Sequence, residues 1–289
     1  MELNGKVLAE EICDTLFDRC SELRKKGVVP KLRIVTTGDN KAGQVYVRNK
    51  IKRAGEIGIE VVVNHFDYLR EEDAEKVFFD EIIPTIYQLP ITGNADIGSL
   101  PMSNIMRDLA ILDVDGFVSS YNTAALFSGK APLNYPCTPK GIIKLLDAYG
   151  IDIAEKCVCI VGRSNIVGRP LAAMFEQRDA TVILCHSKTL NETFINSVRI
   201  ADIIVPATWY RGILTERKVY DFGIDLSDKV LVDVGMNRDK DGKLCGDFDH
   251  ALYEQAYAYT PVPGGVGPMT VAMLMQNVIE CYERMCEQC

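Results

Sequence analysis

The sequence predicts an α/β protein in which helices and strands alternate and the sheets are mostly parallel. Helix-like and strand-like segments alternate in the first third of the chain, and the alternation resumes at Lys156. The 289 residues are enough for two domains. Apolar residues make up 47% of the chain and charged residues 25%, which is the balance of a globular protein.

The first third of the chain predicts one parallel sheet with covering helices. Apolar residues recur at helical spacing in three segments, and β-branched runs lie between them. Gly58 ends the second helical segment, and glycines and a proline within residues 90–112 indicate a surface excursion. The expected elements are helices over 8–25, 41–56 and 71–82 and strands over 32–37, 59–63 and 84–89.

The second half repeats the alternation and is typical of a doubly wound nucleotide-binding unit. Thr138 and Pro139 indicate a helix start, with threonine as the N-cap and proline in the first helical position. A last helix over 268–288 follows a loop rich in proline and glycine, and we expect it to pack back on the first domain. The other expected elements are strands over 157–162, 181–185, 202–206 and 230–234 and helices over 169–177 and 189–199.

Composition limits the classes of partner. The net charge of −8 disfavours binding to nucleic acid or to an anionic membrane. The sequence contains no run of about 20 apolar residues, so it predicts no membrane span. The first residues form an acidic amphipathic pattern rather than a signal peptide. The ten cysteines are scattered, and the one CxxC, Cys286 to Cys289, lacks a second pair and a nearby histidine. We therefore expect a cytoplasmic protein with reduced thiols and no bound metal.

A glycine turn after the strand over 157–162 predicts an anion-binding site. The segment Gly162-Arg-Ser-Asn-Ile-Val-Gly168 joins this strand to a helix that carries Pro170 near its start. The N-terminus of that helix therefore meets the turn, and helix N-termini bind phosphate groups. The spacing differs from G-x-G-x-x-G, so a plain glycine turn remains the alternative interpretation of this pattern alone.

The end of the next strand indicates which dinucleotide binds. NAD sites place an acidic residue there to hold the ribose 2′-hydroxyl. Here the strand over 181–185 ends in His186-Ser-Lys-Thr189, which offers donors and positive charge but no carboxylate. Together with Arg163, this composition favours NADP over NAD. The residues predicted to hold the cofactor are Gly162, Arg163, Ser164, Ile166, Val167, Gly168, His186, Ser187, Ala207 and Thr208.

Three segments of the first half carry polar groups suited to catalysis. Tyr46 and Lys50 are four residues apart on an expected helix and share one face. Gln88 ends a strand, where the ligands of α/β sheets gather. Asp113 and Asp115 alternate before a glycine turn. Each segment alone also has a structural explanation, such as a solvated lysine on a helix surface.

Motifs throughout the chain carry a family resemblance. They are Tyr46-Val-Arg-Asn-Lys50, Gln88-Leu-Pro90, Asp113-Val-Asp-Gly-Phe117, Pro136-Cys-Thr-Pro139, Gly162-Arg-Ser-Asn-Ile-Val-Gly168, Cys185-His-Ser-Lys-Thr189, Asp233-Val-Gly235 and Thr260-Pro-Val-Pro-Gly-Gly-Val-Gly-Pro-Met-Thr270. In this order, and over nearly the whole chain, the sequence resembles the bifunctional methylenetetrahydrofolate dehydrogenase/methenyltetrahydrofolate cyclohydrolases. The last motif is long and highly specific to that family.

The resemblance implies the architecture. It predicts a three-layer α/β substrate domain, a Rossmann-type dinucleotide-binding domain and a folate site in the cleft between them. The substrate domain would comprise residues 1–120 with 268–289, and the Rossmann domain residues 138–265. Members of the family are usually homodimers, so the resemblance also implies a homodimer.

The resemblance also implies roles for individual residues. Lys50 would be the catalytic lysine, and Tyr46 would stack on or orient the folate. Gln88 would hydrogen-bond and tune Lys50, and Asp115 would anchor the pterin ring. A loop that closes over substrate and nicotinamide would be shaped by Pro263, Gly264 and Gly265. The residues expected to contact substrate are Tyr46, Gln88, Leu89, Pro90, Asp115, Pro263, Gly264, Gly265 and Thr270.

The implied reaction belongs to the one-carbon metabolism that supplies purine biosynthesis. It oxidises 5,10-methylenetetrahydrofolate to 5,10-methenyltetrahydrofolate with NADP and hydrolyses the product to 10-formyltetrahydrofolate. Hydride loss needs no strong base because the ring nitrogen lone pairs support the developing cation, so orientation dominates. A lysine that is neutral part of the time can act as general base in the hydrolysis. The three histidines are distant from Tyr46 and Lys50 in sequence, which favours a lysine-centred mechanism.

Three features depart from the family pattern. Leu112 replaces a basic residue, residues 91–111 are unfamiliar, and Trp209 replaces a glycine after Ala207-Thr208. The only tryptophan can crowd the dinucleotide or stack against it. The main alternative is therefore a cyclohydrolase with weak or lost dehydrogenase activity. A different Rossmann oxidoreductase and a non-catalytic folate-binding regulator are more remote alternatives.

Overall fold

The structure is a computed structural model that describes residues 1–37, 41–67, 83–88 and 110–287. The chain divides into two compact units. One combines residues 1–9 with 138–270 and contains a five-stranded sheet. The other combines residues 10–137 with 271–289 and contains a three-stranded sheet. We call them the five-stranded unit and the three-stranded unit.

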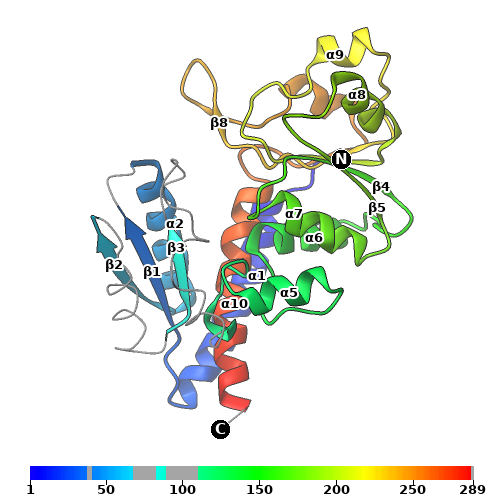
Figure 1. Ribbon diagram of the computed structural model, residues 1–289. Helices are drawn as coiled ribbons and strands as arrows, with labels where there is room; N and C mark the ends of the chain where they lie inside the picture. The colour runs from blue at the N-terminus through cyan, green and yellow to red at the C-terminus, as the bar shows by residue number, and fades with distance from the viewer. Residues whose placement is uncertain (38–40, 68–82, 89–109, 288–289) are drawn as a thin grey trace. The chain divides into compact units, whose positions relative to one another are not determined.

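The three-stranded unit is built on a parallel sheet with the strand order β2-β1-β3. Helix α2 connects β1 to β2 and packs against β2, as Figure 1 shows. Its buried face carries Ala54 and Ile57, three residues apart, whereas Lys52 and Glu56 on the same helix are exposed. The elements are β1 (Lys31–Thr37), α2 (Lys41–Ile57), β2 (Glu60–Phe66), β3 (Thr85–Gln88), the 3-10 helix η2 (Ala110–Leu112) and α5 (Ser120–Phe127).

The five-stranded unit is also a parallel sheet, with the order β10-β7-β6-β4-β5. From β4 the chain adds β5 on one side and then β6 on the other, so the direction of winding reverses between β4 and β6. Ligands of doubly wound sheets bind at the carboxyl ends of the strands at such a point. The elements are α6 (Cys137–Ala148), β4 (Cys157–Val161), α7 (Gly168–Glu176), β5 (Thr181–Cys185), α8 (Asn191–Ile200), β6 (Ile203–Pro206), α9 (Glu216–Asp221), β7 (Val230–Leu231), β8 (Asn237–Arg238), β9 (Leu244–Cys245), the 3-10 helix η3 (His250–Gln255) and β10 (Ala258–Tyr259).

Strand β4 is buried on both faces. Cys159 and Val161 belong to a core cluster that includes Phe194 of α8, and the alternate residues Val158 and Ile160 are buried as well. Helix α7 packs against β4 and β5. A parallel sheet covered on both faces needs such a continuous apolar strand, which explains why the sequence Cys157-Val-Cys-Ile-Val161 carries no alternation.

The first residues of the chain extend the five-stranded sheet. Glu2 forms a parallel bridge with Tyr259 of β10. The Leu3 amide donates to the Tyr259 carbonyl at 2.7 Å, and the Tyr259 amide donates to the Met1 carbonyl at 2.9 Å. Helix α1 (Gly5–Lys25) follows, and helix α10 (Val266–Glu287) ends the described chain.

The predicted alternation is confirmed, with some corrections. Helix α6 begins at Cys137, so Thr138 lies inside the first turn and is not the N-cap. The strand predicted over 230–234 ends at Leu231. The pattern missed the short elements α5, α9, β8, β9 and β10, which have too few residues to show a period. The helix predicted over 71–82 lies outside the described residues. Within the described residues, no helix is long and apolar enough to cross a membrane.

Candidate functional site

The predicted catalytic pair lies on one turn of α2. Tyr46 and Lys50 are both half-buried, as expected for side chains one helical turn apart on a face that borders the protein interior. Burial raises the pKa of the Asp115 carboxyl, and the nearby positive charge of Lys50 opposes this rise. The ammonium group of Lys50 and the carboxyl of Asp115 therefore come within electrostatic reach of each other, although 65 positions separate them in the sequence.

The two aspartates of the Asp113-Val-Asp115 motif have different environments. Asp113 is fully buried, and its carboxylate accepts hydrogen bonds from the amides of Gly116 at 3.1 Å and Ser119 at 2.8 Å. Further donors are the Val118 amide at 3.1 Å and Asn122 Nδ2 at 3.3 Å. Burial raises the pKa of Asp113 to about 6, although these donors favour the charged form. Asp113 thus shapes the loop, and Asp115 is the carboxyl that interacts with Lys50.

The loop that carries Asp115 is also held from α10. The side-chain amide of Asn277 donates to the carbonyls of Val114 at 2.8 Å and Tyr135 at 3.0 Å. Gly116 has a φ of +79°, and a Cβ there would lie 2.5 Å from the Tyr135 backbone. Only glycine fits both the left-handed backbone and this close approach. These contacts fix the backbone on both sides of Asp115.

The other predicted residues of the three-stranded unit are partly outside the described chain. Gln88 is the last residue of β3, in register with Thr36 of β1. Leu89, Pro90 and most of the unfamiliar segment 91–111 lie outside the described residues. Leu112, which departs from the family pattern, is buried in the core at 1% exposure. A basic side chain there would lose its hydration, so the apolar residue suits this position.

The predicted glycine turn joins β4 to α7 at the point where the sheet winding reverses. Gly162 has a φ of +129°, and a Cβ there would lie 2.5 Å from the Ala207 carbonyl oxygen that follows β6. A Cβ on Gly168 would overlap the Gly162 carbonyl oxygen. One glycine therefore permits the tight turn and the other permits close packing of the helix on it, which are two of the roles that glycines have in dinucleotide-binding turns.

Ser164 caps the start of α7. Its hydroxyl oxygen accepts the amides of Val167 at 3.1 Å and Gly168 at 3.4 Å. Arg163, Ser164 and Ile166 are exposed, so the turn presents its side chains to solvent above the helix N-terminus. An exposed arginine beside a helix N-terminus is suited to bind a phosphate group. The residues of this turn fit a dinucleotide pyrophosphate.

The segment after β5 forms a compact turn. The Thr189 hydroxyl oxygen accepts the His186 amide at 2.9 Å, and His186 Nδ1 accepts the Lys188 amide at 3.1 Å. Ser187 and Lys188 are exposed. The Gly162 amide donates to the Cys185 carbonyl at 2.9 Å, so this turn lies beside the glycine turn. Residues 186–189 offer hydroxyl and ammonium groups at this edge and no carboxylate.

Trp209 keeps a backbone conformation that glycine favours. Its φ is +55°, in the left-handed region, and 51% of the residue is exposed. The Ala207 amide donates to the Val161 carbonyl at 2.8 Å, so the turn after β6 is attached to the end of β4. Trp209 thus adopts a left-handed backbone, which residues other than glycine rarely adopt.

The predicted substrate loop is held by the first turn of α1. The Lys6 amide donates to the Gly264 carbonyl at 2.7 Å, and Gly5 packs so closely that a Cβ would overlap the Gly265 carbonyl oxygen. Within the loop, the Gly265 amide donates to the Pro261 carbonyl at 2.7 Å. Pro263 is exposed at the loop tip.

Thr270 does not present a free hydroxyl. It is a helical residue of α10, and its hydroxyl donates to the Val266 carbonyl at 3.2 Å. The hydroxyl oxygen also lies 3.0 Å from that of Thr138. This places Thr270 as a link between α10 and α6.

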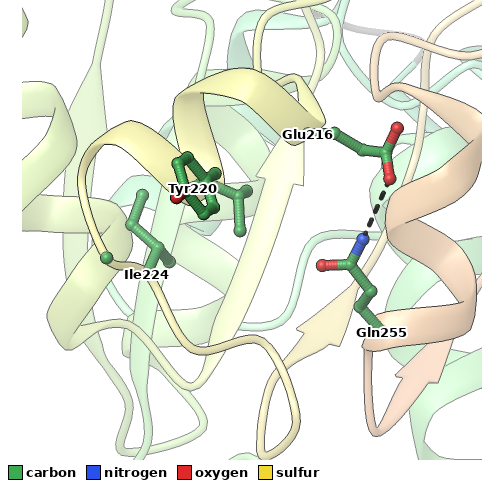
Figure 2. A pocket seen from close by; sticks show the side chains of 6 residues that line it. Glu216, Tyr220, Ile224 and Gln255 are labelled. Carbon is green, nitrogen blue, oxygen red and sulfur yellow. Dashed lines mark hydrogen bonds between the residues drawn. The ribbon is translucent and has the colours of Figure 1, made fainter.

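A hollow of about 430 Å³ lies on α9, away from the predicted residues. Figure 2 shows Glu216 and Tyr220 on the helix, with a 3.5 Å hydrogen bond from Gln255 Nε2 to Glu216 Oε1. Tyr220 is 86% exposed, so the hollow is shallow. No residue predicted for substrate or dinucleotide lines it, and we assign it no role.

Sequence reasoning missed the acidic residues that hold the dinucleotide edge. Asp233 belongs to the motif Asp233-Val-Gly235, but the sequence predicts no role for it or for Asp247. Burial raises the pKa of Asp233 to about 6, and its carboxylate accepts the amides of Asp247 and Phe248, each at 2.9 Å. Asp233 lies in the apolar run over 230–234 that predicts a buried strand, whereas Asp247 lies in a segment without periodicity, where the sequence contains no signal of its burial.

Family models match most of the chain. Residues 3–89 match the catalytic domain of tetrahydrofolate dehydrogenase/cyclohydrolase. Residues 136–286 match the NAD(P)-binding domain of the same family. The first of these ranges includes Tyr46 and Lys50, and the second includes the glycine turn from Gly162 to Gly168.

Individual relatives support the same assignment. The bifunctional protein FolD of Ligilactobacillus salivarius is 39% identical, over 98% of this chain and 96% of its own. The crystal structure of the bifunctional FolD enzyme methylenetetrahydrofolate dehydrogenase/cyclohydrolase of Campylobacter jejuni is 34% identical, with a TM-score of 0.88 over 99% of both chains.

A third relative was solved with a dinucleotide. The dehydrogenase-cyclohydrolase (FolD) of Trypanosoma brucei, complexed with NADP cofactor and an inhibitor, is 28% identical, with a TM-score of 0.86 over 99% of this chain and 98% of that chain. The two-domain α/β class predicted from the sequence is confirmed by these structures. The chain belongs to the tetrahydrofolate dehydrogenase/cyclohydrolase family.

Proposed function

We propose that this protein oxidises 5,10-methylenetetrahydrofolate to 5,10-methenyltetrahydrofolate with NADP and hydrolyses the product to 10-formyltetrahydrofolate. The proposal assigns substrate chemistry to residues 1–120 with 268–289 and dinucleotide binding to residues 138–265. The observation that carries it is the position of Tyr46 and Lys50 on one turn of α2, with the charge of Lys50 acting on Asp115, inside a chain that matches a bifunctional relative over 98% of its length. A cation and a carboxyl from distant segments provide both a proton carrier and an anchor for a polar ring.

The hydrolysis uses Lys50 as the proton carrier. Water adds to the cationic methenyl carbon, one carbon–nitrogen bond breaks, and one proton is released overall. In the proposal, the side-chain amine of Lys50 acts as the general base that takes a proton from the attacking water. Asp115 accepts hydrogen bonds from the amino-substituted pterin ring, while Tyr46 packs against the ring on the same helix turn. Gln88 orients Lys50 in this proposal.

The oxidation depends on orientation. NADP, when bound, would supply the hydride acceptor for the methylene carbon, whose neighbouring nitrogens support the developing cation. The chain aligns the reactants: Gly162 and Gly168 set the turn, and the start of α7 with Arg163 holds the phosphates. The loop of Pro263, Gly264 and Gly265 excludes water from the reacting carbon. Both steps then proceed on one bound folate.

The test is a paired assay of the intact protein. We expect reduced dinucleotide to form when methylenetetrahydrofolate and NADP are supplied, and methenyltetrahydrofolate to disappear without any dinucleotide. Both reactions are followed by absorbance. Hydrolysis without dinucleotide reduction would favour the second candidate, a cyclohydrolase with weak or lost dehydrogenase activity, for which the half-exposed Trp209 in the turn after β6 is the motivating observation. Absence of both reactions would contradict the proposal.

The preference for NADP follows from the turn after β5. A Ser187→Asp substitution would place a carboxylate where NAD sites bind the ribose 2′-hydroxyl, and it would repel a 2′-phosphate. We expect the ratio of kcat/KM for NADP to that for NAD to fall at least about tenfold, the effect of one charge-assisted contact.

The matched control for this substitution is Thr181→Asp. Thr181 is an exposed residue at the opposite end of the same strand. The control should leave the ratio unchanged because the added charge is distant from the carboxyl edge. An equal fall in both variants would mean that net charge, rather than the position of the carboxylate, sets the preference.

The proposal also includes the cellular compartment and the oligomeric state of the protein. The nine cysteines within the described residues form no disulfide bond with one another, which supports a reducing compartment such as the cytoplasm. The family resemblance supports a homodimer, and sedimentation velocity of the purified protein measures it directly.

A further inference from the structure

The turn that follows β6 is organised by one buried carboxylate. Asp247 Oδ2 accepts three hydrogen bonds from this turn: the Thr208 amide at 2.8 Å, the Thr208 hydroxyl at 2.8 Å and the Trp209 amide at 3.1 Å. The Tyr210 amide in turn donates to the Thr208 hydroxyl oxygen at 3.1 Å. Asp247 is completely buried and lies 39 residues from Thr208 in sequence.

Asp247 also holds the far end of the same loop. Its main-chain carbonyl accepts the amides of Gly212 at 2.8 Å and Ile213 at 3.0 Å. Its second carboxylate oxygen accepts Asn237 Nδ2 at 2.8 Å. The loop from Thr208 to Ile213 is therefore attached to one residue at both ends.

A second aspartate fixes Asp247 itself. The Asp247 amide donates to Asp233 Oδ1 at 2.9 Å, and the Tyr253 hydroxyl donates to Asp233 Oδ2 at 2.9 Å. A Cβ on Gly235 would overlap the Asp247 carboxylate, and a Cβ on Gly246 would overlap that of Asp233. The two carboxylates are thus packed against glycine backbone and have no freedom to move away from the turn.

The carboxylate supports a backbone that is strained for tryptophan. Trp209 adopts a φ of +55°, which brings a Cβ close to the following carbonyl and is unfavourable for residues other than glycine. Hydrogen bonds from two successive amides to an ionised carboxylate in a buried site are stronger than neutral ones. They hold the left-handed conformation although the side chain disfavours it.

We propose that Asp247 is a positioning residue for the dehydrogenase half-reaction, holding the Thr208–Trp209 turn in the conformation that leaves room for the dinucleotide beside Gly162. The proposal rests on the proposed function. It follows from the contact between the turn and the glycine turn, where a Cβ on Gly162 would lie 2.5 Å from the Ala207 carbonyl oxygen. A shift of the Thr208–Trp209 turn by less than the size of a methyl group would move the Ala207 carbonyl oxygen that lies against Gly162. Asp247 acts through the turn and touches no substrate in the proposal.

The experiment is a double-mutant cycle of Asp247→Asn and Trp209→Gly. The asparagine amide turns one acceptor into a donor and removes the charge. D247N alone should raise the KM and the Kd for NADP at least about tenfold, the loss expected for charge-assisted hydrogen bonds. Glycine needs no support in the left-handed region. In a W209G background, D247N should therefore raise the KM and the Kd for NADP by no more than about threefold.

Two readouts separate positioning from general stability. Cyclohydrolase activity requires no dinucleotide and should stay within about twofold of wild type in D247N, because additivity holds for residues that share no contact. Asp249→Asn, a half-buried aspartate two positions away whose side chain makes no hydrogen bond at the start of η3, is the matched control and should leave the KM for NADP unchanged.

The outcomes each decide the proposal. A folded D247N with unchanged affinity for NADP overturns it, as does an equal loss in the wild-type and W209G backgrounds. If D247N does not fold, Thr208→Val removes one of the three donors to Asp247 together with the acceptor of the Tyr210 amide, and it should raise the KM at least about threefold, the net value of one hydrogen bond. An unchanged KM in T208V then overturns the proposal.

The test also separates this inference from the proposed function. If the wild-type protein binds NADP in calorimetry but reduces none of it, the dehydrogenase proposal is contradicted. The Kd for NADP, compared between wild type and D247N, then still tests the role of Asp247. Wild-type protein that binds no dinucleotide contradicts both.

Discussion

Replacing Lys50 with methionine is expected to lower the rate of methenyltetrahydrofolate hydrolysis by about 10² to 10⁴-fold, the usual contribution of a general acid–base group. Methionine keeps the length and apolar stem of lysine but carries no ammonium group, so the helix and its packing remain. The loss should appear in kcat, because the group acts on the attacking water rather than on binding alone. Absorbance of the methenyl substrate measures the rate, and circular dichroism confirms the fold.

The matched control lies on the same helix. Lys52 has a side chain that is 80% exposed, and its ammonium group lies 3.8 Å from Glu56. Lys52→Met removes the same charge two positions away from the site, and hydrolysis should stay within about twofold of wild type, because an exposed ion pair contributes little. Full activity in Lys50→Met would contradict the lysine-centred mechanism. Equal losses in both variants would indicate an effect of net charge on the substrate.

Replacing Gly168 with alanine is expected to weaken NADP binding and leave the hydrolysis of methenyltetrahydrofolate intact, whereas Lys50→Met impairs the hydrolysis. The added Cβ would overlap the Gly162 carbonyl oxygen, so the start of α7 must shift away from the turn. We expect the free energy of unfolding to fall by about 2 kcal/mol, as for other overpacked buried sites. Loss of the helix N-terminus at the phosphates should weaken NADP binding by about 30-fold, which corresponds to roughly 2 kcal/mol.

Gly267→Ala is the control for this prediction. Gly267 also lies in the first turn of a helix, α10, but a Cβ there meets no atom within 4 Å. Calorimetric titration with NADP and urea unfolding should therefore give wild-type values for the control. Hydrolysis of methenyltetrahydrofolate should survive in folded Gly168→Ala, because Lys50 and Asp115 belong to the other unit. Undiminished NADP affinity in Gly168→Ala would show that α7 does not bind the phosphates.

Much of the fold and part of the site are readable from the sequence because they depend on local spacing. Tyr46 and Lys50 share a face as soon as the segment is helical, since side chains four residues apart meet on one side. The strand over 157–161 and the glycines at 162 and 168 are recognisable from an apolar run followed by residues that a tight turn requires. These features need no information about distant segments.

Other features depend on contacts that the local pattern does not contain. Asp113 and Asp115 look equivalent in the sequence. In the structure, Asp113 accepts hydrogen bonds from backbone amides, whereas the charge of Lys50 acts on Asp115. Thr138 looks like an N-cap, yet helix α6 begins one residue earlier. Trp209 looks like a simple replacement in the sequence, but in the structure its backbone is left-handed and its amide is bound by Asp247.

The sequence by itself determined the α/β class, the family and the glycine turn, because each depends on residues that are neighbours along the chain. Only the tertiary structure decided on which carboxyl the charge of Lys50 acts and which one holds the turn after β6. Asn277 reaches Val114 across 163 positions, and Asp247 reaches Thr208 across 39. Such hydrogen bonds exist only after the intervening chain has been closed into a compact unit that excludes water, so the local sequence pattern does not contain them.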